Sequence, residues 1–151
     1  MLVAKRISFW RGRYRVLADD RPVTTWDTAL WRSGGEFELD GSRYQVRGNF
    51  WGGRFTMVDD AGTPVAAANR VGRKRWTVDA AGQTYQFRRQ SVWSGTQELY
   101  NMAGPVGVVR RTSLWRGDVA GELPGMPLPV QVFVLGVIIT LWDAQSGAAG
   151  A

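Results

Sequence analysis

Residues 128–142 read Leu-Pro-Val-Gln-Val-Phe-Val-Leu-Gly-Val-Ile-Ile-Thr-Leu-Trp, and this stretch decides the fold. Only Gln131 and Thr140 are polar, so the segment lacks the polar face of a surface helix. It is too long for an ordinary strand, and Pro129 suits the first turn of a helix. It is also shorter than the roughly 20 residues that a bilayer-spanning helix needs. We therefore predict that Val130–Trp142 is a helix enclosed by protein, with a carboxy-terminal membrane anchor as the alternative.

The chain before this helix has the pattern of short strands joined by tight turns. Three turns share the pattern Asp/Asn-x-Ala-Gly, at residues 59–62, 79–82 and 101–104. Asp or Asn at the first position and Gly at the fourth favour a type I turn, in which the glycine takes a positive φ. Asp40-Gly41 suits a two-residue hairpin loop. The spacing predicts an antiparallel meander of about 11 or 12 strands between residues 2 and 123.

Side chains alternate along these strands, so that aromatic residues share an inner face and arginines an outer face. A four-residue loop at 79–82 places Trp76 opposite Tyr85 and Arg73 opposite Arg88. Apolar residues then meet on one side of the hairpin and charged residues on the other, which is the arrangement that fixes a strand register.

The domain organisation follows from these elements. We expect a single domain over residues 1–143, in which a closed antiparallel barrel encloses one hydrophobic helix at 128–143. A segment rich in Pro and Gly, residues 121–127, links the barrel to the helix. Residues 144–151 are expected to form a disordered tail.

This combination resembles the tubby-like superfamily, which includes the tubby carboxy-terminal domain, the LURP-one-related proteins and the phospholipid scramblases. The resembling segments are the hairpin at 36–44, the strands around 55–58 and 76–78, and the helix at 130–142. The resemblance implies a barrel of about 12 strands around a central helix. It also implies attachment to membranes through anionic headgroups. No motif for headgroup-binding residues carries over to this chain, and the sequence has no dense acidic loop of the kind that calcium needs.

Composition narrows the classes of function. The 151 residues include no cysteine and no histidine, which excludes disulfides, thiolate metal sites and every nucleophile activated by histidine. The net charge is +6, and the start of the chain has no apolar core of a secretory signal. We expect a cytoplasmic protein with anionic partners, peripheral at the inner face of the membrane when it binds lipid.

One basic cluster is denser than the others and is the candidate anion- or lipid-binding site. Its members are Arg70, Arg73, Lys74 and Arg75, with Arg88 and Arg89 brought alongside by the hairpin. Arginine binds phosphate in a bidentate, charge-assisted way. The alternative is a solvated strand face, kept soluble by like charges. Two smaller groups are Arg11, Arg13 and Arg15, and the pair Arg110-Arg111.

Support for catalysis is weak. The paired carboxylates Asp59-Asp60 belong to a turn, where Asp caps the backbone, and Asp19-Asp20 is the other such pair. We assign no catalytic residue, no metal ligand and no cofactor. Most aromatic side chains fall on the inner face, whereas Trp10 and Trp51 lie beside glycine and arginine and suit a membrane interface or a stacked base.

The sequence thus favours a non-enzymatic module that binds anionic phospholipid or another phosphorylated ligand at a membrane surface. The first alternative is a protein-interaction or accessory domain without a ligand. The second, less favoured, is nucleic-acid binding through the same basic face.

Overall fold

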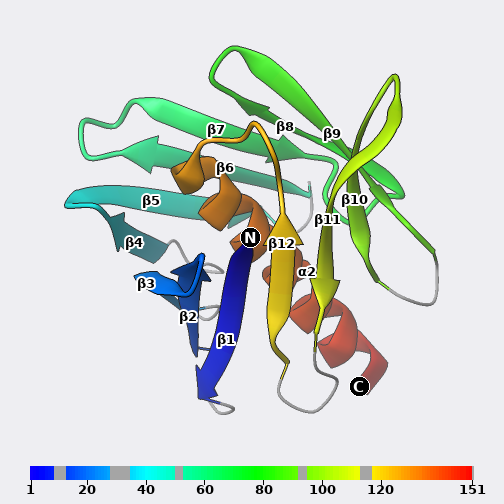
Figure 1. The fold of residues 1–151 in the computed structure, drawn as a ribbon, viewed down its shortest axis with the longest axis horizontal. Helices are drawn as coiled ribbons and strands as arrows, with labels where there is room; N and C mark the ends of the chain where they lie inside the picture. The colour runs from blue at the N-terminus through cyan, green and yellow to red at the C-terminus, as the bar shows by residue number, and fades with distance from the viewer. Residues whose placement is uncertain (9–12, 28–34, 50–52, 92–94, 113–116, 151) are drawn as a thin grey trace.

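A computed structural model describes residues 1–8, 13–27, 35–49, 53–91, 95–112 and 117–150. The described part contains twelve β-strands and one helix (Figure 1). The strands are β1 (Leu2–Ser8), β2 (Arg13–Ala18), β3 (Arg21–Asp27), β4 (Gly35–Leu39), β5 (Ser42–Asn49), β6 (Arg54–Asp59), β7 (Pro64–Asn69), β8 (Arg75–Ala80), β9 (Gln83–Arg89), β10 (Gln97–Asn101), β11 (Gly104–Arg111) and β12 (Val119–Glu122). The helix α2 spans Leu128–Gly150.

The strands form one antiparallel sheet that curls into a nearly closed barrel. Its order is β3-β2-β1-β12-β11-β10-β9-β8-β7-β6-β5-β4, so that strands consecutive in the chain pair with each other, except β3 and β4, and β1 pairs with β12. The two ends of this order, β3 and β4, pack near each other without pairing as strands. The predicted antiparallel meander of 11 or 12 strands is confirmed.

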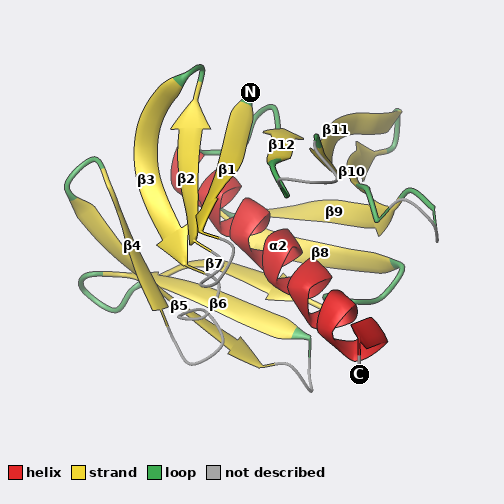
Figure 2. Ribbon diagram, turned by 90° about the horizontal axis from the view of Figure 1, so that it is seen from below, coloured by secondary structure: helices red, strands yellow, loops and turns green. Residues whose placement is uncertain are grey.

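Helix α2 runs through the interior of the barrel, as predicted (Figure 2). Every residue from Val132 to Thr140 is buried. By length and composition Leu128–Gln145 is capable of crossing a membrane, but 61% of that stretch is buried inside the protein. Because strands surround the helix, all of its sides contact the core, which explains why it has no polar face.

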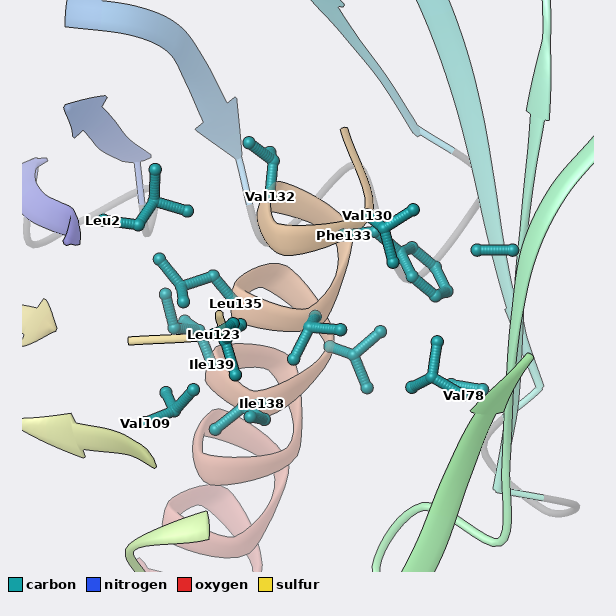
Figure 3. Close-up of a cluster of buried hydrophobic side chains, with 14 of the residues drawn as sticks. Leu2, Val78, Val109, Leu123, Val130, Val132, Phe133, Leu135, Ile138 and Ile139 are labelled. Carbon is teal, nitrogen blue, oxygen red and sulfur yellow. The ribbon is translucent and has the colours of Figure 1, made fainter. Parts of the chain in front are cut away.

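Side chains from opposite sides of α2 contact different walls of the barrel. In Figure 3, Leu135 points toward the side of Leu2, whereas Phe133 points toward Val78 on β8. All four side chains are at most 1% exposed. Burying one such side chain contributes about 1.5–3 kcal/mol, so the helix completes the core.

Two boundaries differ from the sequence prediction. The helix continues to Gly150, so residues 144–150, expected to be a disordered tail, are helical. This tail contains several alanines, which have the highest helix propensity and allow a preformed helix to continue. Gly121 and Glu122, assigned to the linker, belong to β12. A Cβ on Gly121 would lie 2.6 Å from Leu135 Cδ1, so a glycine here allows β12 to pack closely against the helix.

The turn glycines behave as their sequence pattern indicates. Gly62, Gly82 and Gly104 have φ values of 78°, 73° and 113°. Asp40 and Gly41, at 51° and 79°, form the predicted two-residue hairpin loop, flanked by the pair Leu39 and Ser42. These turns lie at the end of the barrel opposite the loop that joins β7 to β8.

Candidate anion-binding site

The structure places the six predicted site residues on three different parts of the β7–β9 region. Arg70, Arg73 and Lys74 lie in the loop between β7 and β8, and Arg75 is the first residue of β8. All four side chains are exposed. Arg88 and Arg89 are the last two residues of β9, and both are only partly exposed. The four cations of the loop and the start of β8 thus differ in exposure from the two cations at the end of β9.

Backbone contacts hold the β7–β8 loop in place. Val71 N donates a hydrogen bond to Gly53 O at 2.8 Å, and Arg73 N donates one to Arg70 O at 3.1 Å. A Cβ on Gly53 would lie 2.5 Å from Val71 O, so only glycine permits this approach. Arg70 itself has a φ of 62°, a conformation that costs a non-glycine residue about 1–2 kcal/mol. The loop is thus tied to the start of β6 and presents its cations outward.

The register of the β8–β9 hairpin corrects the sequence prediction. Arg75, not Arg73, lies opposite Arg88, and Trp76 lies opposite Phe87 rather than Tyr85. The cause is the turn: Ala81 and Gly82 both have positive φ, 53° and 73°, so the loop has two residues instead of four. A shift of two residues keeps every side chain on its predicted face.

Arg88 forms an ion pair with Glu98 and is therefore not available to bind an anion. The two residues face each other across β9 and β10, with Arg88 Nε 3.6 Å from Glu98 Oε1. The Arg88 guanidinium also lies 4.8 Å from the centre of the Tyr100 ring. Because its charge is paired and its side chain packs on a ring, Arg88 contributes to the sheet surface rather than to an anion site.

Arg89 does not belong to the outer face. Arg89 lies two residues after Phe87 on β9, so both side chains point to the same side of the strand, and Phe87 is fully buried. Arg89 also lies opposite the buried Gln97 on β10. Its backbone N donates to Lys74 O at 2.9 Å, which extends the β8–β9 ladder by one bond. Two of the six predicted residues, Arg88 and Arg89, are therefore not part of the exposed cluster.

The remaining four cations lie within six consecutive residues and are all exposed, and we call them the β7–β8 cluster (Arg70, Arg73, Lys74 and Arg75). Among the described residues, none of these four side chains makes an ion pair or a hydrogen bond. The cluster lies close to the carboxy-terminal half of α2, since a Cβ on Gly72 would be 3.6 Å from Leu141 Cδ1. Exposed Arg and Lys side chains without an ion pair inside the described part of the protein suit a phosphate-bearing ligand.

A second basic pair was not singled out from the sequence. Lys5 on β1 lies opposite Arg15 on β2, and both side chains are exposed. Arg13 shares this outer face, whereas Arg11 lies outside the described residues. The pairing of β1 with β2 is the signal that would have joined Lys5 to this group.

Arg110 and Arg111 point to opposite faces of β11. Arg110 is exposed on the outer face, beside Ala120. The Arg111 guanidinium lies 4.6 Å from the centre of the Trp142 ring near the end of the buried part of α2. Arg111 therefore covers the helix where it leaves the barrel.

The acidic pairs have structural roles. Asp59 Oδ1 accepts hydrogen bonds from Ala61 N and Thr63 N at 3.0 and 2.9 Å, which is the predicted capping of the turn. Asp19 and Asp20 form the turn between β2 and β3, with φ values of 49° and 69°. Within the described residues, no group of three or more acidic side chains is placed to hold a metal ion.

Among the described residues, the three tryptophans (Trp26, Trp76 and Trp142) are buried in the core. Trp26 and Trp76 are 2% and 1% exposed, and Trp76 Nε1 donates to Gln97 Oε1 at 2.9 Å. Burial raises the pKa of the Tyr14 phenol to about 12, with the Asp143 carboxylate as a second cause. The Tyr14 phenol therefore keeps its proton to a higher pH than an exposed tyrosine does. Trp10 and Trp51, predicted to suit an interface, lie outside the described residues.

Comparison with protein-family models, with curated proteins and with solved structures finds no match to this chain.

Proposed function

We propose that this protein is a non-enzymatic module that binds anionic phospholipid or another phosphorylated ligand at a membrane surface, on the cytoplasmic side. The observation that carries the proposal is the β7–β8 cluster: four exposed cations within six residues, none of them neutralised among the described residues. The architecture of a barrel around an apolar helix also fits the resemblance to the tubby-like superfamily, whose theme is attachment to anionic headgroups.

The shape of the β7–β8 loop supports the same proposal. The loop is fixed by two backbone hydrogen bonds, from Val71 N and from Arg73 N, before any ligand arrives. A preorganised cluster loses less conformational freedom on binding than four cations on a flexible loop. The cluster sits at one end of the barrel, where its loop lies close to the carboxy-terminal half of α2.

The test compares two triple variants with equal changes in charge. The site variant combines Arg73→Gln, Lys74→Gln and Arg75→Gln. The control variant combines Lys5→Gln, Arg15→Gln and Arg110→Gln, which are exposed on β1, β2 and β11. Binding is measured by co-sedimentation with phosphatidylcholine vesicles, with and without 30% phosphatidylserine, and by titration with a DNA duplex.

Each basic residue near an anionic surface contributes about 1 kcal/mol, so the site variant should bind about 100-fold more weakly than wild type. The control variant should lose much less, and both should keep the wild-type melting temperature because the mutated side chains are exposed. Added salt should weaken wild-type binding. An equal loss in both variants would show net charge without a site. No binding to anionic vesicles would leave the accessory-domain alternative, and stronger binding to DNA the nucleic-acid alternative.

A further inference from the structure

Charged residues are segregated between the two ends of the barrel. Successive turns of an antiparallel meander alternate between its ends, so the turns after β2, β4, β6, β8 and β10 share one end, which we call the acidic end. Strand β12 also ends here, and α2 begins just beyond it. Among the described residues, the turns and strand ends of the acidic end contain six acids and one base: Asp19, Asp20, Asp40, Asp59, Asp60, Glu122 and Arg21. The amino group of Met1 pairs with Asp19 at this end.

The opposite end, which we call the basic end, carries the β7–β8 cluster. Its described turns and strand ends contain eight bases: Arg13, Arg54, Arg70, Arg73, Lys74, Arg75, Arg89 and Arg111. All of these side chains are exposed except that of Arg89, which is half-buried. The acids in the same set are Asp27 and Asp118, and Asp118 Oδ1 accepts a hydrogen bond from Arg6 N at 3.1 Å.

Helix α2 changes this balance little. It leaves the barrel at the basic end, where the Arg111 guanidinium lies 4.6 Å from the centre of the Trp142 ring. The next residue, Asp143, is the single charged residue of α2, and residues 144–150 add no charge. The basic end therefore keeps a clear excess of cations.

The two ends are far enough apart to act separately on a charged surface. Strand β6 has Arg54 at the basic end and Asp59 at the acidic end, and its six residues place them about 17 Å apart along the strand. The Debye length is about 8 Å at physiological ionic strength. A surface in contact with one end therefore interacts weakly with the charges of the other, whatever the net charge of the protein.

We infer that the protein meets an anionic phospholipid bilayer with the basic end of its barrel and holds its acidic end away in solution. The inference rests on the proposed function and extends it, because it orients the molecule and adds a cation outside the β7–β8 cluster. This cation is Arg54, which is exposed and makes no ion pair among the described residues. Its neighbour Gly53 accepts the hydrogen bond from Val71 N, which places Arg54 beside the cluster.

The first test compares single variants at the two ends. Arg54 and Arg21 are both exposed first residues of a strand, at the basic and the acidic end. On phosphatidylcholine vesicles with 30% phosphatidylserine in 0.15 M salt, we expect Arg54→Gln to weaken binding about fivefold and Arg21→Gln by less than about twofold. Equal effects of the two substitutions would overturn the inference.

The second test raises the net charge at the acidic end alone. The variant combines Asp20→Asn, Asp40→Asn and Asp60→Asn, three exposed turn residues. Asp20 and Asp40 have positive φ, which asparagine tolerates well, so the turns should keep their shape. Because these positions are screened from a surface at the basic end, binding should stay within about twofold of wild type. An increase of tenfold or more would overturn the inference, since attraction would then follow net charge alone.

The third test reads the orientation directly. The chain has no cysteine, so a single introduced cysteine carries a fluorophore at one chosen place. Gln90→Cys labels the loop after β9 at the basic end, and Ala61→Cys labels the turn after β6 at the acidic end; both side chains are exposed. With phosphatidylcholine spin-labelled on its headgroup in the same vesicles, the label at position 90 should be quenched and the label at position 61 should not.

Failure of the orientation can be distinguished from failure of the proposed function. Equal quenching at both positions, or stronger quenching at position 61, would overturn the orientation while vesicle binding still supported the proposed function. No binding of the wild-type protein to the anionic vesicles would overturn both.

Discussion

Replacement of Gly121 by alanine tests the packing of α2 inside the barrel. Gly121 lies in the middle of the closed part of the sheet, paired with Leu2 on one side and Val109 on the other. The added Cβ would lie 2.6 Å from Leu135 Cδ1, whereas ordinary contacts are 3.4–4 Å. Leu135 is 1% exposed and cannot swing into solvent. Overpacking of this kind costs about 1–3 kcal/mol, so G121A should lower the free energy of unfolding by that amount.

The double variant separates a clash with the helix from other effects. Leu135→Ala alone should cost about 2–5 kcal/mol, through lost burial and the cavity left behind. With Leu135 shortened, the methyl group added by G121A has room, so the double variant should cost about 1–3 kcal/mol less than the sum of the single variants. Urea unfolding, with the slopes compared between variants, measures each free energy.

A second cycle provides the control. Phe133 points to the other side of α2, toward β8 (Figure 3). G121A combined with Phe133→Leu should therefore be additive to within about 0.5 kcal/mol. Additive behaviour of G121A with Leu135→Ala, or a G121A variant as stable as wild type, would refute the close approach of β12 to the helix.

Two further predictions follow from the core. Deletion of residues 128–151 removes the buried helix, so the remaining chain should be insoluble or should bind the dye ANS and lose its near-ultraviolet circular dichroism; a soluble truncated chain with the wild-type melting temperature would contradict this and favour a membrane anchor. Because burial raises the pKa of Tyr14 from 10.0 to about 12, the folded state holds the phenolic proton more tightly than the unfolded state. The resulting stability is present below about pH 10 and lost as the pH rises to about 12, by up to about 3 kcal/mol. Unfolding curves across this range should fall less steeply for Tyr14→Phe than for wild type, and identical slopes would show that Tyr14 is not the group that titrates.

The helix and the turns could be predicted from the sequence, because each depends on residues that are close together in the chain. An apolar run with only Gln131 and Thr140 polar predicts an enclosed helix, and Thr140 satisfies its hydroxyl within the helix by donating to Gly136 O at 2.8 Å. Asp and Gly at fixed turn positions predict positive φ, because glycine takes this conformation without strain. The number of strands follows from the spacing of these turns.

The register of the β8–β9 hairpin was beyond sequence reasoning. The turns at 59–62, 79–82 and 101–104 share one pattern, yet only the second contains an alanine with positive φ, Ala81. A loop of two residues and one of four place the same side chains on the same faces, since they differ by an even number. The alternation of apolar and charged residues therefore cannot distinguish the two.

The part of the candidate site that is formed by residues close in sequence could be predicted, whereas the part that depends on strand pairing could not. The four cations of the β7–β8 cluster are neighbours in sequence, so their proximity needed no knowledge of the fold. The pairing of Arg88 with Glu98 depends on a contact between β9 and β10, and the lack of pairing between β3 and β4 depends on which strands end the sheet order. Both are long-range properties that a single sequence does not encode in any local pattern.

The pairing of β1 with β12 has a consequence for biosynthesis. Leu2 leaves the ribosome well before its partner Gly121, which belongs to the last strand of the barrel. Until then β1 has an exposed edge and the barrel has no filling, because α2 follows β12 in the chain. Pairing of β1 with β12 and entry of the helix must therefore come after most of the barrel is synthesised, and contacts of such sequence separation form slowly. The nascent chain meanwhile exposes the apolar faces of its strands, which makes this barrel a candidate client for chaperones that shield such surfaces.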